Sequence, residues 1–417
     1  MNKPAAEKVT LPKVANDGFA SLRGKAREAF ERQGWPGRRH ESYKYSALTR
    51  LGRKEWPRAE KAAVSSDLPA PLGTRLAWVN GYPVASPRLD WIKALKDCAN
   101  PVPLELARLL GHVAPEADPV VALNTALFDH GAWIELADGA ATEQPLELTW
   151  AADARAAGHA QHGRFALRLG AGSRLVLIER HVGGAGDALR SRVAEIALGE
   201  GARLFHIRIN DADPGMNLLG YTAVEAQAGA DYRCLTLDLG AKLARESYYV
   251  HLAGDRTNAS LRGLAITDGS RHADSDVVVE HDALFTRSRQ FFRGVVDDRS
   301  RSVYSGRVIV RPGAQKTNSL QESANLLLSS KAEADARPQL EIYADDVVCN
   351  HGAATGAIDE DALFYLQSRG VDATAARRMI AFGFARTVLE DVEDSALHQT
   401  LMRLLADDMQ APPEMSE

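Results

Sequence analysis

The chain of 417 residues is poor in features that mark several protein classes. It has three cysteines, Cys98, Cys234 and Cys349, too few for a disulfide-based scaffold. Because the N-terminal residues contain no apolar export segment, we expect all three to be thiols in a reducing compartment. Cys98 and Cys234 are expected to be small buried hydrophobes. No stretch approaches the ~18 unbroken apolar residues that a membrane span requires.

A strong excess of either charge is also lacking. The formal net charge is -5 and the isoelectric point is about 6.2, which argues against a sequence-independent grip on nucleic acid. Hydrophobic residues make up 45% of the chain and charged residues 25%, an ordinary balance for a globular protein. These values predict a soluble, cytoplasmic protein that binds neither nucleic acid nor a membrane.

Common catalytic motifs are missing as well. The sequence contains no Gly-x-x-x-x-Gly-Lys-Ser/Thr run, so we expect no ATP site in this chain. It also lacks Gly-x-Ser-x-Gly and His-Glu-x-x-His, and the glycine cluster at 183–186 is typical of a turn. These motifs therefore supply no candidate catalytic residues and no candidate cofactor-binding residues.

What the chain has instead is a regular repeat. Alternating apolar runs are interrupted by turns at Gly172, Gly201, Gly229 and Asn258, spaced 28 or 29 residues apart. So steady a period indicates stacked units, each with an apolar face inward and a polar face outward. Units of strand and tight turn favour a parallel β-helix, with a sandwich of short antiparallel strands as the alternative. Such a solenoid leaves edge strands that a further domain or a partner must cover.

The segments before the repeat differ from it. Residues 16–34 have the pattern of an amphipathic helix that Asp17 caps and Gly34 ends. Apolar runs on both sides of Asn80–Gly81 predict a hairpin, because both turn residues tolerate positive φ. We expect four parts: an N-terminal helical domain (1–75), a mixed α/β lead-in (76–155), a mainly β parallel β-helix core (156–350) and a C-terminal helical domain (351–417).

The C-terminal part is predicted to be helical after Ile358. Asp359 is a candidate N-cap for a first helix that Gly370 ends, Asp372 caps a second, and residues 394–409 form a third. These helices carry more apolar surface than short helices can hide from one another. The excess indicates either packing within the chain or a module that binds a partner.

Cys349 and His351 are the chemically notable pair. They follow LEIYADDVV (340–348), a predicted last strand, and on an extended backbone they project to the same side. Both are ligands for iron or zinc, and two ligands cannot complete a site. The pair is half of a metal site completed by another chain, a nucleophile with its base, or part of a buried turn. The small residues 352–354 would let another backbone approach.

A long stretch around this pair resembles a known family. Residues 314–370, AQKTNSLQESANLLLSSKAEADARPQLEIYADDVVCNHGAATGAIDEDALFYLQSRG, resemble the C-terminal signature of the SufB/SufD family of iron–sulfur cluster assembly proteins. GWPGRRHESYKYSAL (34–48) and VALNTALFDHGAWIEL (121–136) resemble two other blocks of that family. The SufD branch fits better than the SufB branch, which typically carries His-Glu-Ala in place of residues 351–353.

The resemblance implies a right-handed parallel β-helix between helical N- and C-terminal domains. It implies a non-enzymatic scaffold subunit of a SufBCD complex that forms a heterodimer with SufB and binds the ATPase SufC through its C-terminal helices. A homodimer is possible for the isolated chain. A transient iron–sulfur cluster would form at the interface with SufB, with His351 as a metal ligand and Cys349 as its companion.

Three alternatives remain at this point. A SufB-like paralogue would have the same scaffold role. A β-helix enzyme acting on carbohydrates would need several carboxylates on one outer strand face, and the repeats show no such ladder. A thiol hydrolase would use Cys349 as nucleophile and His351 as base, although neighbouring positions on one strand are poorly placed for that chemistry.

Overall fold

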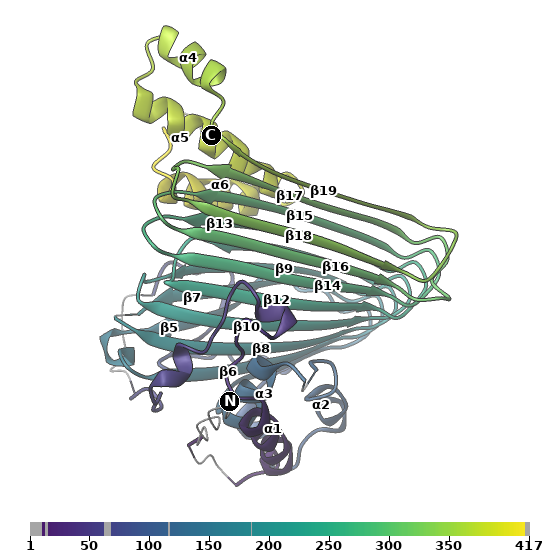
Figure 1. Ribbon diagram of the computed structural model, residues 1–417. Helices are drawn as coiled ribbons and strands as arrows, with labels where there is room; N and C mark the ends of the chain where they lie inside the picture. Colours follow the sequence, from purple (N-terminus) through teal and green to yellow (C-terminus); the bar gives the residue numbers. More distant parts are fainter. Residues whose placement is uncertain (1–10, 13–15, 62–67, 116, 185, 413–417) are drawn as a thin grey trace, which may run out of the picture.

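The computed structural model describes residues 11–12, 16–61, 68–115, 117–184 and 186–412. Two sheets face each other along most of the chain, with ten and nine strands counted over these residues (Figure 1). Successive strands pass from one sheet to the other, so that strands two apart in the chain pair in parallel. The chain is therefore a mainly β protein built on a parallel β-solenoid of about eight turns, with helices towards both ends. This confirms the predicted β-helix over the antiparallel sandwich.

The strands are long and similar in length. The ten-stranded sheet contains β1 (Thr74–Val79), β2 (Tyr82–Ala85), β5 (Leu146–Ala152), β7 (Arg174–Gly183), β9 (Arg203–Ala212), β11 (Asp231–Asp238), β13 (Asn258–Thr267), β15 (Arg287–Val296), β17 (Asn318–Leu327) and β19 (Val348–Ala357). The nine-stranded sheet contains β3 (Ile92–Ala94), β4 (His130–Leu136), β6 (Ala160–Leu169), β8 (Ala188–Leu198), β10 (Met216–Ala226), β12 (Leu243–Leu252), β14 (His272–His281), β16 (Arg301–Val310) and β18 (Glu333–Ile342).

The helices lie before and after the solenoid. They are α1 (Ala20–Gln33), α2 (Leu104–Leu109), α3 (Pro119–Leu127), α4 (Glu360–Ser368), α5 (Ala373–Ala385) and α6 (Ser395–Asp408), with 3-10 turns at Glu41–Tyr43, Leu51–Arg53, Leu95–Cys98, Ala154–Ala156 and Arg386–Leu389. Among the described residues no helix combines the length and the apolar character needed to cross a membrane.

The repeat found in the sequence corresponds to the corners of the solenoid. Gly172, Gly201 and Gly229 adopt positive φ angles of 66°, 64° and 67° in the turns that lead into the ten-stranded sheet. The prediction of Asn258 as the fourth turn residue is wrong, because Asn258 is the first residue of β13. The residue with a left-handed conformation at this corner is Arg256, with φ 58°. Glycine marks the first three corners because it adopts this conformation without steric cost, whereas a later non-glycine corner leaves no compositional signal.

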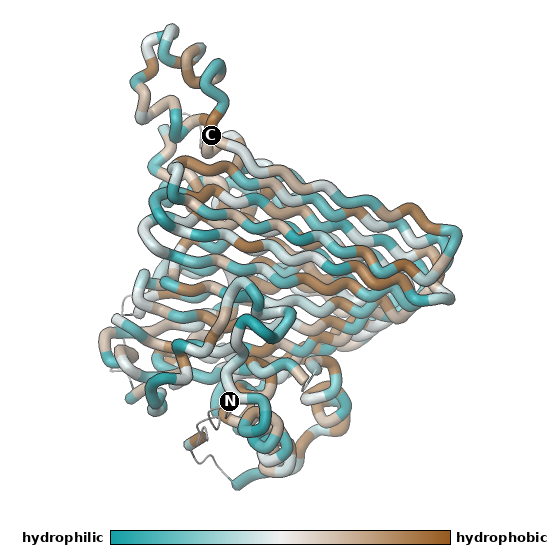
Figure 2. The backbone as a smooth tube through the Cα atoms, in the orientation of Figure 1, coloured by the Kyte–Doolittle hydropathy of each residue, from teal (hydrophilic) through white to brown (hydrophobic). Residues whose placement is uncertain are grey.

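The two faces of the strands differ from the simple prediction of apolar inside and polar outside. One half of the interior is apolar, with residues such as Leu177, Ile196 and Val224 packed between the sheets. The other half contains buried charges such as Glu179 and Arg192. Hydrophobic and hydrophilic residues alternate along the strands in Figure 2. Strand periodicity alone therefore could not show which polar residues face inward.

The C-terminal helices cover apolar residues on the outer face of the ten-stranded sheet. Ile207, Leu235 and Phe291 point outward from the ten-stranded sheet and share one hydrophobic cluster with Phe382 and Leu401 of α5 and α6. These helices thus cover the outer face of the sheet, while α4 extends beyond the strands (Figure 1). Packing within the chain therefore accounts for most of the apolar surface of α5 and α6.

The local predictions at the two ends are largely confirmed. Gly34, with φ 66°, ends α1 as predicted, but the N-cap residue is Phe19 and not Asp17. The carboxylate of Asp17 instead accepts a hydrogen bond from the amide of Phe19, just before the helix. Asn80 and Gly81 have positive φ and join the antiparallel strands β1 and β2. In the C-terminal part, Asp359, Asp372 and Asp394 cap α4, α5 and α6 through their side chains.

The division into four domains stays a prediction. Strand β19 crosses the predicted boundary between residues 350 and 351, because it pairs with β17 from residue 348 to residue 357. The first C-terminal helix begins at Glu360, close to the predicted start after Ile358. Segments 1–10 and 62–67 of the predicted N-terminal domain lie outside the described residues.

Buried histidines should make the stability of the solenoid depend on pH. His281 contacts the hydroxyls of Thr286 and Ser288 at 2.7 and 2.9 Å, and burial lowers its pKa to about 4. An unfolded histidine has a pKa of ~6.5, so the stabilisation is complete above that value and is lost as the pH falls towards 4. Between pH 7.5 and 5.5 the loss for this residue amounts to about 1.4 kcal/mol.

Thermal unfolding at the two pH values measures this loss. We expect the His281→Gln variant to lose less stability between pH 7.5 and 5.5 than the unsubstituted chain. His112→Gln, which changes an exposed histidine after α2, serves as the control and should follow the unsubstituted chain. Parallel pH profiles for all three proteins would contradict the prediction.

Candidate functional site

The two ends of the solenoid are finished differently. At the N-terminal end, the short strands β2 and β3 add antiparallel edges to the two sheets. At the C-terminal end, β19 pairs only with β17 and β18 only with β16 among the described residues. Nearly every residue of β19 is exposed, and those of β18 are at most half-buried. The C-terminal end therefore presents two adjacent edges with backbone groups available for further pairing.

Cys349 and His351 both lie in β19 at this open end. The prediction of one strand over residues 340–348 is wrong, because β18 ends at Ile342 and β19 begins at Val348 after a turn. The pair is therefore inside a strand, and Gly352 and the two alanines after it continue that strand rather than form a loop. This arrangement excludes the buried turn as an account of the pair.

The register of the strands shows where His351 points. It pairs with Gln321 of β17, which pairs with Gln290 of β15, and both glutamines are fully buried between the sheets. His351 thus continues an interior column of side chains, but it is exposed because no further turn follows. Its imidazole belongs to the mouth of the solenoid and not to the outer face.

Cys349 occupies the same side of the strand in a less exposed position. It packs against an apolar corner formed by Val308, Val310, Ala314 and Leu340. Partial burial raises the pKa of the Cys349 thiol. A nucleophilic cysteine needs a lowered pKa, so this environment does not support the thiol hydrolase.

The geometry suits an incomplete metal site. Side chains two residues apart on one strand have Cα atoms separated by about 6.6 Å, so thiol and imidazole would have to lean together to reach one metal. Over the part of the chain that the structure describes, no group of three or more histidine, cysteine, aspartate or glutamate residues could hold a metal ion. Cys349 and His351 remain predicted ligands whose completion requires groups from elsewhere.

Exposed apolar side chains gather in two places in the C-terminal part of the chain, one around the start of β19 and one after it. Ile342, Tyr343 and Val348 are 40%, 58% and 58% exposed around the turn between β18 and β19. Phe364 and Tyr365 on α4 are 72% and 56% exposed. Large apolar side chains of this exposure mark surfaces where another protein binds. We call the first set the end corner and the second the α4 patch.

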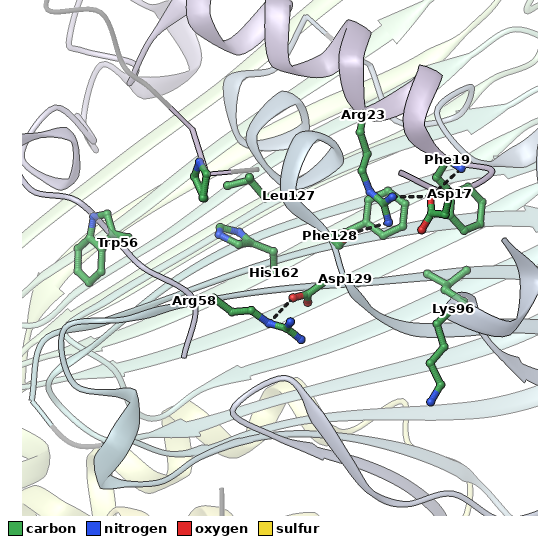
Figure 3. Close-up of a pocket in the computed structure, with 12 residues that line it drawn as sticks. Asp17, Phe19, Arg23, Trp56, Arg58, Lys96, Leu127, Phe128, Asp129 and His162 are labelled. Carbon is green, nitrogen blue, oxygen red and sulfur yellow. Dashed lines mark hydrogen bonds and ion pairs between the residues drawn. The ribbon is translucent and has the colours of Figure 1, made fainter. Parts of the chain in front are cut away.

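A cavity of about 340 Å³ lies at the other end, between the N-terminal segment and the first turns of the solenoid (Figure 3). Two arginines of its wall are paired with carboxylates: Arg23 contacts Asp17 at 2.5 Å, and Arg58 contacts Asp129 at 2.6 Å. Lys96 also lines the cavity. Burial lowers the pKa of His162, also in its wall, to about 4, so this ring is neutral. The cavity thus lies where the N-terminal segment packs against the first turns of the solenoid, and polar side chains form much of its wall.

Sequence reasoning missed the end corner and the α4 patch as separate surfaces. The residues of the end corner were assigned to a strand, where alternate burial would have hidden some of them. A charged Asp345–Asp346 pair between two apolar residues was the available signal for a corner. The carbohydrate-active alternative gains no support, because the outer carboxylates Glu280 and Glu322 pair with Arg311 and Arg293 of neighbouring strands.

Fold and site together define a class of protein. It is a parallel β-solenoid with helices at both ends, one finished end, and one open end that carries two potential metal ligands. The family model described as "SUF system FeS cluster assembly, SufBD core domain" matches residues 151–384. The chain belongs to the SufBD family of iron–sulfur cluster assembly proteins, which confirms the family predicted from the sequence.

Individual relatives agree with this assignment. The chain is 29% identical to the iron–sulfur cluster assembly protein SufD of Escherichia coli over 89% of its own length and 88% of that protein. It is 24% identical to SufD of Bacillus subtilis over 69% of this chain and 66% of the other. A SufBD family protein of Synechocystis is 34% identical over 51% of this chain, which spans about half the length of that relative.

Proposed function

We propose that this protein is a non-enzymatic scaffold subunit for iron–sulfur cluster assembly that works in a SufBCD complex. The observation that carries the proposal is the open end, where two unpaired strand edges, an exposed histidine and a cysteine lie together. In this function the cluster is cargo that forms at an interface, and this chain contributes only some of its ligands.

The open end is the surface proposed to pair with SufB. Both sheets stop at the same level, so a partner with a similar end can extend both sheets through backbone hydrogen bonds. The end corner adds the apolar contact that such an interface requires at its centre. Pairing would bring the partner's ligands over His351 and Cys349 and would so complete the metal site. Without SufB, the same edges can pair with a second copy of this chain.

The α4 patch is the surface proposed to bind the ATPase SufC. α5 and α6 are held against the solenoid by the hydrophobic cluster on its outer face, whereas Phe364 and Tyr365 are open to a partner. ATP binding and hydrolysis would belong to SufC, since this sequence has no P-loop. We place the complex in the cytoplasm.

A SufB-like role is the alternative within the family. The near full-length similarity to SufD of Escherichia coli and the sequence His351–Gly352–Ala353 favour the SufD role. Co-expression with SufB and SufC, purification through a tag on this chain, and anaerobic iron and sulfide analysis test the proposal. We expect both partners and a cluster in the purified complex. Recovery of this chain alone, without SufB or SufC, would contradict it.

Charge at the end corner should weaken pairing with SufB. The substitution Tyr343→Asp places a carboxylate in an apolar interface, and we expect the affinity for SufB to fall about tenfold because the charge must lose its water. Binding between purified chains, measured by calorimetry, gives the value. Phe364→Asp on α4 is the matched control, since it makes the same chemical change on the other surface and should leave SufB binding unchanged. Equal SufB affinities for the Tyr343→Asp variant and the unsubstituted chain would remove the end corner from the interface.

A further inference from the structure

A layer of buried charges crosses the interior of the solenoid. Glu179 of β7 contacts Arg192 of β8 at 3.1 Å, and Arg192 contacts Glu246 of β12 at 2.8 Å. Arg208 of β9 reaches Glu246 at 3.2 Å and Asp238 of β11 at 3.4 Å. Each arginine of this layer therefore has at least two carboxylates to balance its charge.

Arg190 breaks this pattern. It lies two residues before Arg192 on the same inward side of β8 and is 2% exposed. Its Nε donates to Oε1 of Gln161 at 3.2 Å, but its two terminal nitrogens have no hydrogen-bond partner in the described part of the chain. Burial lowers the pKa of Arg190 to about 9, with no charged neighbour as a cause. Because arginine keeps its proton in proteins, this is a buried positive charge without a counter-ion.

His181 lies opposite Arg190. Glu179 of β7 is in contact with Arg192 of β8. His181 follows Glu179 by two residues and Arg190 precedes Arg192 by two, so both lie on the same side of their strands as that contact and closer to the corner that joins β7 to β8. His181 is 1% exposed, and within the described residues neither ring nitrogen has a hydrogen-bond partner. Its Nε2 is 3.9 Å from a Glu179 oxygen, too far for a hydrogen bond.

The charge state of His181 follows from its surroundings. Burial and three arginines, Arg208, Arg190 and Arg192, with His206 as a further cause, hold its pKa well below the usual value. The ring is therefore neutral and carries one N–H, which has no acceptor among the described residues.

Gln161 supplies a third donor. It pairs in register with Arg190 from the neighbouring strand β6, and it is 4% exposed. Since its oxygen accepts from Arg190, its amide nitrogen is the free end, and that buried nitrogen has no partner among the described residues. Ala188 and Leu218 belong to the apolar cluster that closes the adjacent corner.

Three neighbouring buried side chains thus have hydrogen-bond donors without acceptors and carry one net positive charge. A buried unpaired charge is strongly unfavourable, and donors to an anion form stronger hydrogen bonds than donors to a neutral group. Water would accept these hydrogen bonds but would not balance the charge. The close-packed interior favours an anion with few atoms over a large oxyanion.

We propose that the solenoid binds a small monovalent anion, of the size and charge of chloride or hydrosulfide, between Arg190, His181 and Gln161. The anion balances the charge of Arg190 and stabilises the early turns of the solenoid. The site is separate from the open end, since β7 and β8 are several turns away from β19, and it goes beyond the proposed scaffold function.

Long-wavelength anomalous diffraction from crystals of the full chain tests the proposal, because chlorine and sulfur scatter anomalously and oxygen does not. We expect an anomalous peak beside the Arg190 guanidinium. A peak that grows across the chlorine absorption edge identifies chloride, and one that is equal on both sides identifies a sulfur anion. Crystals from protein purified in bromide should show bromine in the same place if the site exchanges halide. Density for water alone, without an anomalous peak, overturns the proposal.

A variant adds a measurement in solution. At constant ionic strength, the thermal midpoint of the unsubstituted chain should rise when chloride replaces gluconate, and the Arg190→Met variant should lose this rise. Arg174→Met, which removes an exposed arginine from the start of β7, is the matched control and should keep it. An equal rise in Arg190→Met and the control contradicts the proposal. The diffraction test uses the unsubstituted chain and decides the matter even if Arg190→Met does not fold.

Discussion

Replacing His351 by alanine is expected to leave the chain folded and able to assemble, yet to remove most of the iron–sulfur cluster from the proposed complex. The imidazole is exposed at the mouth of the solenoid, so its loss opens no cavity in the core. As a metal ligand it has no substitute nearby, because Cys349 is the one other candidate on β19. We expect the cluster content to fall at least tenfold. Loss of a residue that only hydrogen-bonds to a metal ligand already lowers metal affinity or activity about tenfold or more, and loss of a ligand itself should cost no less.

The measurement is anaerobic co-expression with SufB and SufC, followed by iron and sulfide analysis of the purified complex. Asn350→Ala is the matched control, because Asn350 is exposed on the same strand and points to the opposite side. It should retain the full cluster content. A normal yield from His351→Ala in an intact complex would refute the role of His351 as a ligand.

The companion substitution Cys349→Ser separates two versions of the site. If the partner supplies the essential thiolate, Cys349→Ser should lose less cluster than His351→Ala, because Cys349 is partly covered by the apolar corner. If both residues bind iron, the two variants should lose equal amounts.

Replacing Phe364 by aspartate is expected to weaken SufC binding about a hundredfold while SufB binding stays unchanged. Phe364 is the most exposed large apolar side chain of α4, and aromatic anchors of this kind carry much of the energy of an interface. Gln367→Ala changes an exposed residue of the same helix and should have little effect. Calorimetric titration of each variant with purified SufC gives the affinities. Unchanged binding by Phe364→Asp would show that the ATPase docks elsewhere.

Substitution is a sharper test here than deletion of the C-terminal helices. α5 and α6 cover apolar residues on the outer face of the ten-stranded sheet, such as Ile207 and Leu235. A chain shortened at Asp359 would expose that face and would lose stability for reasons unrelated to a partner. The α4 patch can instead be altered without uncovering the sheet.

Much of the fold could be predicted from the sequence because solenoid turns are local and repetitive. The spacing of Gly172, Gly201 and Gly229 gave the period, since glycine takes positive φ more readily than other residues. The helix caps Asp359 and Asp372 were visible for a similar reason: their side chains bond the first free amides of the helices. Such features depend on a few neighbouring residues.

The rest depends on contacts between distant residues, which periodicity does not show. Alternation along β7 and β8 could not show that Glu179 and Arg192 meet inside the solenoid. The position of His351 in the last strand also required the register with Gln321, because the run before it looked like a single strand. Its ligand role still rests on the family resemblance and on its place at the open end.

Because the turns are stacked, different parts of the chain determine the length of the solenoid and the surface at its open end. Each inner turn pairs only with the turns before and after it, so duplication or loss of a whole turn would preserve the backbone ladder. Loss of one residue inside a strand would instead move the side chains in the rest of that strand to the opposite face. The last turn alone sets the edges β18 and β19. Two related subunits can therefore differ in their number of turns and still pair end to end. Such pairing depends on the shape of the terminal edges β18 and β19 and not on the length of the solenoid.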